Sequence, residues 1–300
     1  MNVDGLEVKK VKVIENLRID DRLTGKEISD YIKHLSPNLD IDYQPTSNKE
    51  EFLKALSSIL LETNEDEGIL LFIESHGNKK GVCFSGELVE WSEIYKLLSD
   101  INEKSCMGLI VVFSCCYGVN FYKQTSILDK CPYFLMLGFS GRINENKLIE
   151  CNKRIVDGLI NSESTLVIEE EINLLLPMTD TKLTILDAGD VFDNAIRHYL
   201  ISSMDEVELS KRAVDNYQEH LTGCLAVSAV PFSFDKFKKI MYQQLLSKNY
   251  LEESYYKLKD RFLLTDKYMH LNCRFSSMCD GVYKELNVEH EHNKILRKLT

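Results

Sequence analysis

In the first half of the chain, apolar runs that predict strands alternate with amphipathic stretches that predict helices. Three runs are continuously apolar, as is typical of strands buried on both faces of a sheet: Gly68–Glu74, Gly108–Phe113 and Tyr133–Phe139. An earlier run, Val8–Ile14, interleaves β-branched residues with lysines and predicts another strand. Amphipathic patterns fill the intervals and predict helices near residues 24–35, 52–60, 91–98 and 146–160.

The order of these elements predicts the fold class. Strands separated by helices favour an α/β fold with a mostly parallel sheet covered on both faces. Sequences of the form Ser/Thr-x-x-Glu, at Thr24–Glu27 and Ser47–Glu50, predict where the first two helices start. In such a sheet the ligand site lies beyond the carboxyl ends of the strands, which indicates where to look for chemistry.

The second half of the chain has a different pattern. An apolar, β-like stretch at Thr165–Leu186 is followed by helical periodicity, clearest at Phe234–Leu246 and Tyr250–Leu263. We therefore expect one domain over residues 1–165 and a mainly helical regulatory or scaffold region over residues 166–300. The Thr165–Leu186 stretch can still add a strand to the first sheet.

Composition and charge narrow the function classes. The 300 residues are 44% apolar and 28% charged, and the net charge is −11. This charge argues against a nucleic-acid partner and against docking on an anionic membrane. The N-terminus lacks a signal-peptide pattern, and the longest apolar run is too short to span a bilayer. Nine irregularly spaced cysteines predict reduced thiols, and thus a cytoplasmic location.

Two candidate chemical groups follow adjacent buried strands. Gly68–Glu74 runs into Ser75-His76-Gly77, and Gly108–Phe113 runs into Ser114-Cys115-Cys116-Tyr117-Gly118. Cysteine catalysis needs a thiolate and a nearby imidazole, and a helix starting after Gly118 would favour the thiolate. The glycine after His76 lets the backbone approach a substrate closely, as an oxyanion donor must.

Less specific interpretations compete with this one. A histidine at a strand end is usually a polar loop residue, and a cysteine that closes an apolar strand usually belongs to the core. A zinc site would need an unusual spacing, and an acidic triplet that could bind calcium suits a helix start better. No metal or cofactor is expected. The residues weighed were His270, Cys273, Cys279, His290 and His292 for zinc, and Asp187, Asp190 and Asp193 for calcium.

These segments together resemble caspases and their bacterial relatives. The matching parts are Ile73–Gly77 around the histidine, the hairpin-like Gly81–Val89, Trp91–Tyr95 at the next helix, Val111–Gly118 around the cysteine, and Leu135–Gly141. The ensemble also resembles CHAT-type and separase-like peptidases of the same clan. It covers residues 8–160 and implies a three-layer sandwich. It also implies Cys116 as nucleophile, His76 as acid–base group, and the backbone N–H groups of Gly77 and Cys116 as the oxyanion hole.

Two departures from the family pattern affect the expected site. Ser114 stands two residues before the nucleophile, where relatives carry an acid or glutamine that contacts the substrate side chain. Cys115 beside Cys116 leaves the identity of the nucleophile open by one residue. Ser114, Ser140 and Arg142 are the expected substrate-binding residues, although a loop arginine is more often simply solvated.

The sequence thus leads to two hypotheses about function. The first is a cysteine endopeptidase with a Cys–His dyad that cleaves a protein substrate. We expect it to be latent until a partner or small ligand binds the helical half, and its resemblance to stand-alone relatives points to bacterial defence. The second is a non-enzymatic α/β module that binds a ligand or partner at the same edge, although no glycine-rich phosphate-binding motif is present.

Overall fold

The structure is a computed structural model that describes residues 1–3, 5–65, 67–84, 86–176, 180–202, 205–268, 270–271, 294–295 and 297. The chain divides into two compact units, Met1–Ala188 and Gly189–Thr300. The first unit thus ends at Ala188 and not at residue 165, because the last strand of its sheet lies beyond that residue.

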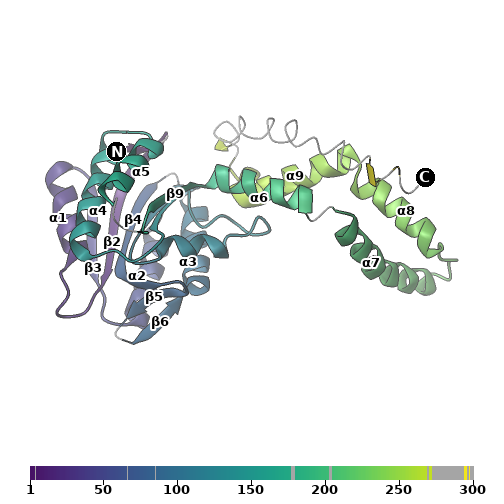
Figure 1. The fold of residues 1–300 in the computed structure, drawn as a ribbon, viewed down its shortest axis with the longest axis horizontal. Coiled ribbons are helices and arrows are strands. Elements are labelled where there is room, and N and C mark those ends of the chain that lie inside the picture. Colours follow the sequence, from purple (N-terminus) through teal and green to yellow (C-terminus); the bar gives the residue numbers. More distant parts are fainter. Residues whose placement is uncertain are drawn as a thin grey trace. The chain divides into compact units, whose positions relative to one another are not determined.

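A mixed, mostly parallel sheet forms the centre of the first unit (Figure 1). Its main strands lie in the order β3–β2–β4–β7–β8–β9, parallel except for antiparallel β9. The prediction of an α/β fold with a mostly parallel sheet is therefore confirmed. The strands are β1 (Asn2–Val3), β2 (Leu6–Asn16), β3 (Asp40–Pro45), β4 (Gly68–Asn78), β5 (Gly81–Phe84), β6 (Glu87–Glu90), β7 (Leu109–Ser114), β8 (Leu135–Phe139) and β9 (Leu183–Asp187).

Helices cover this sheet on both sides. Helices α1, α4 and α5 group on one side, whereas α2 and α3 pack together on the other (Figure 1). This arrangement buries the central strands completely, and Ile69–Ile73 and Leu109–Phe113 are at most 1% exposed. The helices are α1 (Thr24–Leu35), α2 (Lys49–Glu62), α3 (Trp91–Lys104), α4 (Glu145–Ile160) and α5 (Thr165–Leu175).

At the starts of the first two helices, the residues that the sequence predicts as helix caps have other roles in the structure. Helix α1 begins at Thr24 as predicted, but the Thr24 hydroxyl donates to the buried carboxyl group of Glu74 and does not cap the helix. Helix α2 is capped by Asn48, one residue after the predicted Ser47, because the Asn48 side chain accepts from the N–H of Glu51. A buried tertiary partner and a better neighbouring cap changed the roles of these residues.

The Thr165–Leu186 stretch differs from its β-like expectation. Its first part forms helix α5, whose Ile168 and Ile172 are fully buried. Among the described residues of this region, only Leu183–Asp187 forms a strand, β9, which pairs antiparallel with β8 and extends the sheet. A short apolar run does not distinguish a buried helix from a strand by periodicity alone.

The described part of the second unit is helical. It contains α6 (Ala188–Ser202), α7 (Glu206–Ala226), α8 (Phe234–Leu245) and α9 (Lys248–Leu263). Phe192 contacts both Tyr255 and Phe262, which ties α6 to α9. Within the described residues, no helix has the length and apolar character needed to cross a membrane.

Candidate active site

The histidine and cysteine segments extend side by side beyond the parallel pairing of β4 and β7, and β4 continues through His76 to pair with β5. Strands β4 and β7 are parallel neighbours, and Glu74 pairs in register with Ser114. His76 and Cys116 each stand two residues beyond that pair. The shared sheet edge expected from the sequence is therefore the edge at which both groups lie.

Gly77 shows how closely the two segments approach. A side chain added at Gly77 would overlap the carbonyl oxygen of Cys116 and would lie 2.9 Å from the sulfur of Cys115. Only a residue without a Cβ fits between these groups. The backbone that follows His76 therefore packs directly against the backbone of the two cysteines.

Cys116 sits at the start of a tight turn. Tyr117 adopts a left-handed backbone conformation (φ 61°), and its N–H donates to the carbonyl of Gly141 (3.0 Å). Gly118 packs against Phe113 so closely that a Cβ there would lie 2.6 Å from the Phe113 Cβ. The element that follows, η1 (Gly118–Gln124), begins where a helix was expected to favour a thiolate and is a 3₁₀ helix.

The thiol of Cys116 is half-buried and faces the loop after β8. Its sulfur lies 3.4 Å from the N–H nitrogen of Ile143 and 3.7 Å from the Ile143 carbonyl oxygen. A backbone N–H directed at sulfur stabilises a thiolate. The loop at residues 140–144 therefore forms one wall of the site.

His76 interacts with an acid that the sequence analysis missed. Its Nε2 lies 2.7 Å from Oδ2 of Asp21, in the loop between β2 and α1. Burial alone would raise the pKa of Asp21, but hydrogen bonds from the Arg18 N–H and His76 outweigh it and lower the pKa. One signal was available: Asp21 follows a predicted parallel strand and so belongs to the same carboxyl edge as His76.

The two candidate groups are adjacent but are not yet paired. In the described part of the chain, His76 hydrogen-bonds Asp21 and Cys116 hydrogen-bonds Ile143, with no hydrogen bond between imidazole and thiol. The imidazole is 44% exposed and so remains open to solvent. The two groups thus lie at one edge of the sheet, each hydrogen-bonded to a different partner.

Cys115 and Cys116 differ sharply in environment. Cys115 is 1% exposed, and burial raises the pKa of its thiol well above the usual value. A buried thiol in apolar surroundings is a poor nucleophile. Cys116, which is partly exposed, is therefore the better candidate of the two.

The three expected substrate-binding residues have different positions. Ser114 is fully buried, and its hydroxyl donates to Asn152, so it does not reach a substrate in this state. The Ser140 hydroxyl accepts from the N–H of Lys182. Arg142 is exposed, and only its carbonyl is held, by the hydroxyl of Thr181 (2.6 Å). Of the three, Arg142 is the most exposed to solvent.

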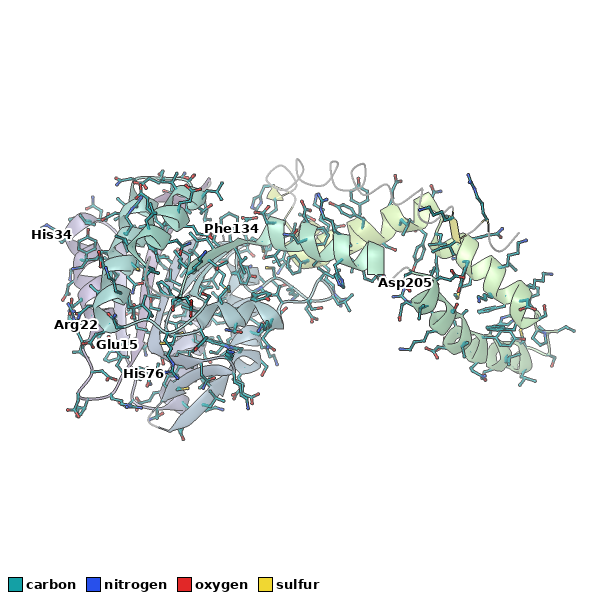
Figure 2. All side chains as sticks on the ribbon, viewed as in Figure 1. Glu15, Arg22, His34, His76, Phe134 and Asp205 are labelled. Atoms are coloured by element: carbon teal, nitrogen blue, oxygen red, sulfur yellow. The ribbon has the colours of Figure 1, made fainter. Side chains whose placement is uncertain are left out.

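A buried polar layer lies directly beneath the site (Figure 2 labels Glu15 and His76). Glu15, Glu74 and Ser114 are register neighbours on β2, β4 and β7. Thr24 and Asn152 each donate to Glu74 at 2.8 Å. Burial nevertheless raises the pKa of Glu74 to about 8, so this carboxyl is largely protonated at neutral pH.

The residues weighed for metals give no site among the described part of the chain. There, no group of three or more His, Cys, Asp or Glu side chains could hold an ion. Asp190 lies in the first turn of α6, as the helix-start interpretation predicts. Cys273, Cys279, His290 and His292 lie outside the described residues.

Comparison of the sequence with known proteins adds no family assignment. No protein-family model matches the chain, and no curated protein matches it.

Proposed function

We propose that this chain is a caspase-like cysteine endopeptidase with Cys116 as nucleophile and His76 as acid–base group. The observation that carries the proposal is the close packing of Gly77 against Cys115 and Cys116 at the carboxyl edge of β4 and β7. This contact brings the end of β4, which carries an exposed imidazole, against the turn that carries a half-buried thiol, and nucleophilic catalysis by cysteine needs these two groups close together.

The proposed reaction follows from these groups. His76 takes the proton of the Cys116 thiol, and the thiolate attacks the scissile carbonyl carbon to form a tetrahedral oxyanion. The N–H groups of Gly77 and Cys116 hold that oxyanion. Collapse of the oxyanion expels the amine, which takes its proton from His76 and leaves a thioester on Cys116. Water then hydrolyses the thioester and restores the free thiol.

We propose that the resting enzyme is latent, because His76 hydrogen-bonds Asp21 and Cys116 hydrogen-bonds Ile143, and within the described residues no hydrogen bond joins the imidazole to the thiol. The loop that holds Cys116 is braced by the segment before β9: Ser140 exchanges backbone and side-chain hydrogen bonds with Lys182, and Thr181 holds Arg142. Strand β9 continues directly into α6 of the second unit. A partner or small ligand bound to the helical unit would thus act on the site through β9.

Labelling with a peptide acyloxymethyl ketone, an electrophile that requires an activated thiol, tests the proposal. The intact chain, Cys116→Ala and His76→Gln are compared, with mass spectrometry to locate the label. The expected result is labelling of Cys116 that is lost in both variants. Labelling at other cysteines alone, or labelling of Cys116 independent of His76, would refute the dyad.

The proposed latency of the enzyme is tested by a separate measurement. The same labelling is followed with and without candidate activators, and an increase in rate is expected on activation. Full labelling and full turnover by the isolated chain would show that the second unit is a scaffold. Absence of labelling under every condition, together with ligand binding at the same edge, would favour the binding module instead.

A further inference from the structure

The loop that joins β2 to α1 places a carboxylate against the proposed acid–base group. Oδ2 of Asp21 lies 2.7 Å from Nε2 of His76 and accepts the backbone N–H of Arg18 at 2.8 Å. The Asp21 side chain is 27% exposed, less than the imidazole that it contacts. The proposed reaction assigns this carboxylate no role, although it touches one of the two groups that carry the chemistry.

The position of Asp21 is fixed by the rest of its loop. The N–H of Asp21 donates to the carbonyl of Arg18 (3.0 Å), which closes a turn around the carboxylate. The adjacent Arg22 donates to Glu27 in α1 (2.7 Å) and to Asn146 in α4 (2.6 Å). Because hydrogen bonds fix the residues on both sides of Asp21, its carboxylate is held in place before any substrate binds (Figure 2 labels Arg22 and His76).

The contact determines which imidazole nitrogen is free. An ionised carboxylate only accepts hydrogen bonds, so Nε2 must carry the proton that lies between His76 and Asp21. In the neutral imidazole the other nitrogen, Nδ1, then has the lone pair. That nitrogen is the one able to accept a proton from a thiol.

We infer that Asp21 is a positioning residue: it holds His76 in the tautomer whose Nδ1 accepts the thiol proton of Cys116. The inference rests on the proposed function for its consequence in catalysis, but the tautomer itself is independent of activity. The step is a proton transfer from sulfur to Nδ1. It leaves a thiolate and an imidazolium whose positive charge faces the Asp21 carboxylate, and the proton later passes to the leaving amine.

The first test reads the tautomer directly. Histidine side chains are labelled with ¹⁵N in the intact protein, His76 is identified with His76→Gln, and the imidazole nitrogens are observed at a pH where the ring is neutral. The expected result is protonation at Nε2, changed toward Nδ1 in Asp21→Asn because an amide can present an N–H to the ring. A tautomer unaffected by Asp21→Asn would overturn the inference.

The second test reads the consequence for the thiol. The rate of Cys116 alkylation and the turnover of a peptide are compared for Asp21→Asn, Asp21→Glu and Asp20→Asn, across pH 5 to 9. Asp20 is the exposed neighbour in the same loop and serves as the matched control. We expect Asp21→Asn to lower kcat about 10-fold or more with little change in KM, out of the roughly 10²–10⁴-fold that a positioned acid–base group contributes.

The outcomes separate this inference from the proposed function. Partial recovery in Asp21→Glu, with Asp20→Asn unchanged, supports a role for the carboxylate. Wild-type kcat and pH profile in Asp21→Asn, in an enzyme that Cys116→Ala inactivates, would overturn the role of Asp21 and leave the peptidase intact. Turnover that survives Cys116→Ala would refute the peptidase, whereas the tautomer measurement would still decide the position of the proton.

Discussion

Two layers of residues lie at the carboxyl end of the sheet, an edge layer and a buried layer. Each contains an acid whose pKa is shifted, and the two shifts have opposite directions. In the edge layer, hydrogen bonds lower the pKa of the partly exposed Asp21, which faces an exposed imidazole. In the layer of Glu15 and Glu74, burial is complete enough to raise the pKa of Glu74 to about 8. Along β4 only two residues separate Glu74 from His76. The pKa values of Asp21 and Glu74 are therefore shifted in opposite directions, because burial outweighs hydrogen bonding only at Glu74.

The same difference in burial distinguishes the two adjacent cysteines. Cys115 belongs to the buried layer and Cys116 to the edge, although they are neighbours in the chain. Substitutions in the edge layer should therefore change reactivity with little effect on folding. Substitutions in the buried layer should change folding with less effect on reactivity.

The largest expected effect is the loss of activity in Cys116→Ala. Peptide turnover by the activated enzyme should fall about 10³-fold or more, since the nucleophile is removed. The free energy of unfolding, measured with urea, should hardly change because Cys116 is partly exposed.

Cys115→Ala is the matched control and should give the opposite result. It leaves a small cavity beside Gly77 and Gly118 and should cost about 1–2 kcal/mol of stability, with most of the turnover retained. An inactive Cys115→Ala with an active Cys116→Ala would show that the nucleophile is one residue earlier.

Gly77→Ala should have the next largest effect, because Gly77 joins the two layers. The added methyl group would overlap the Cys116 carbonyl and press on the Cys115 sulfur, so the end of β4 around His76 or the turn around Cys116 must move. A displacement of about 1 Å at a catalytic group can cost about 10²-fold in rate. We expect a loss of turnover of that order and a lower midpoint in urea unfolding.

Gly223→Ala provides the control for the glycine substitution. Gly223 lies within α7, and an added Cβ would meet no atom within 4 Å. Because alanine favours the helix, the variant should be as stable as the wild type or slightly more so. Equal behaviour of the two variants would mean that the contact at Gly77 does not position the site.

The sequence was sufficient for the parts of this site that depend on strand order. Continuous apolar runs predicted the strands, and parallel neighbours bring His76 and Cys116 to one edge. The partner of His76 could not be assigned in the same way, because Asp21 is brought to it by a turn whose hydrogen bonds to Arg18 leave little trace in the pattern. Ser114 was expected to face a substrate, but its fully buried position depends on Asn152 of α4, 38 residues later in the chain.

The smallest and most specific prediction concerns the pH dependence of stability. The pKa of Glu74 is raised in the folded state, to about 8 from an ordinary value of 4.5, so the folded chain binds this proton more tightly than the unfolded chain. The stabilisation from Glu74 is therefore complete below about pH 4.5 and is lost progressively as the pH rises to about 8. Across that window its contribution to the slope is at most about 1.4 kcal/mol per pH unit.

Glu74→Gln isolates this contribution, because a neutral amide has nearly the shape of the protonated carboxyl. The free energy of unfolding in urea, measured from pH 5 to 9, should fall less steeply with pH in Glu74→Gln than in the wild type. The variant should be relatively more stable at the alkaline end. Glu65→Gln replaces an exposed carboxylate and should keep the wild-type slope. If Glu74→Gln also kept that slope, Glu74 would be charged at neutral pH, and the buried layer would not differ from the edge in the way that its geometry indicates.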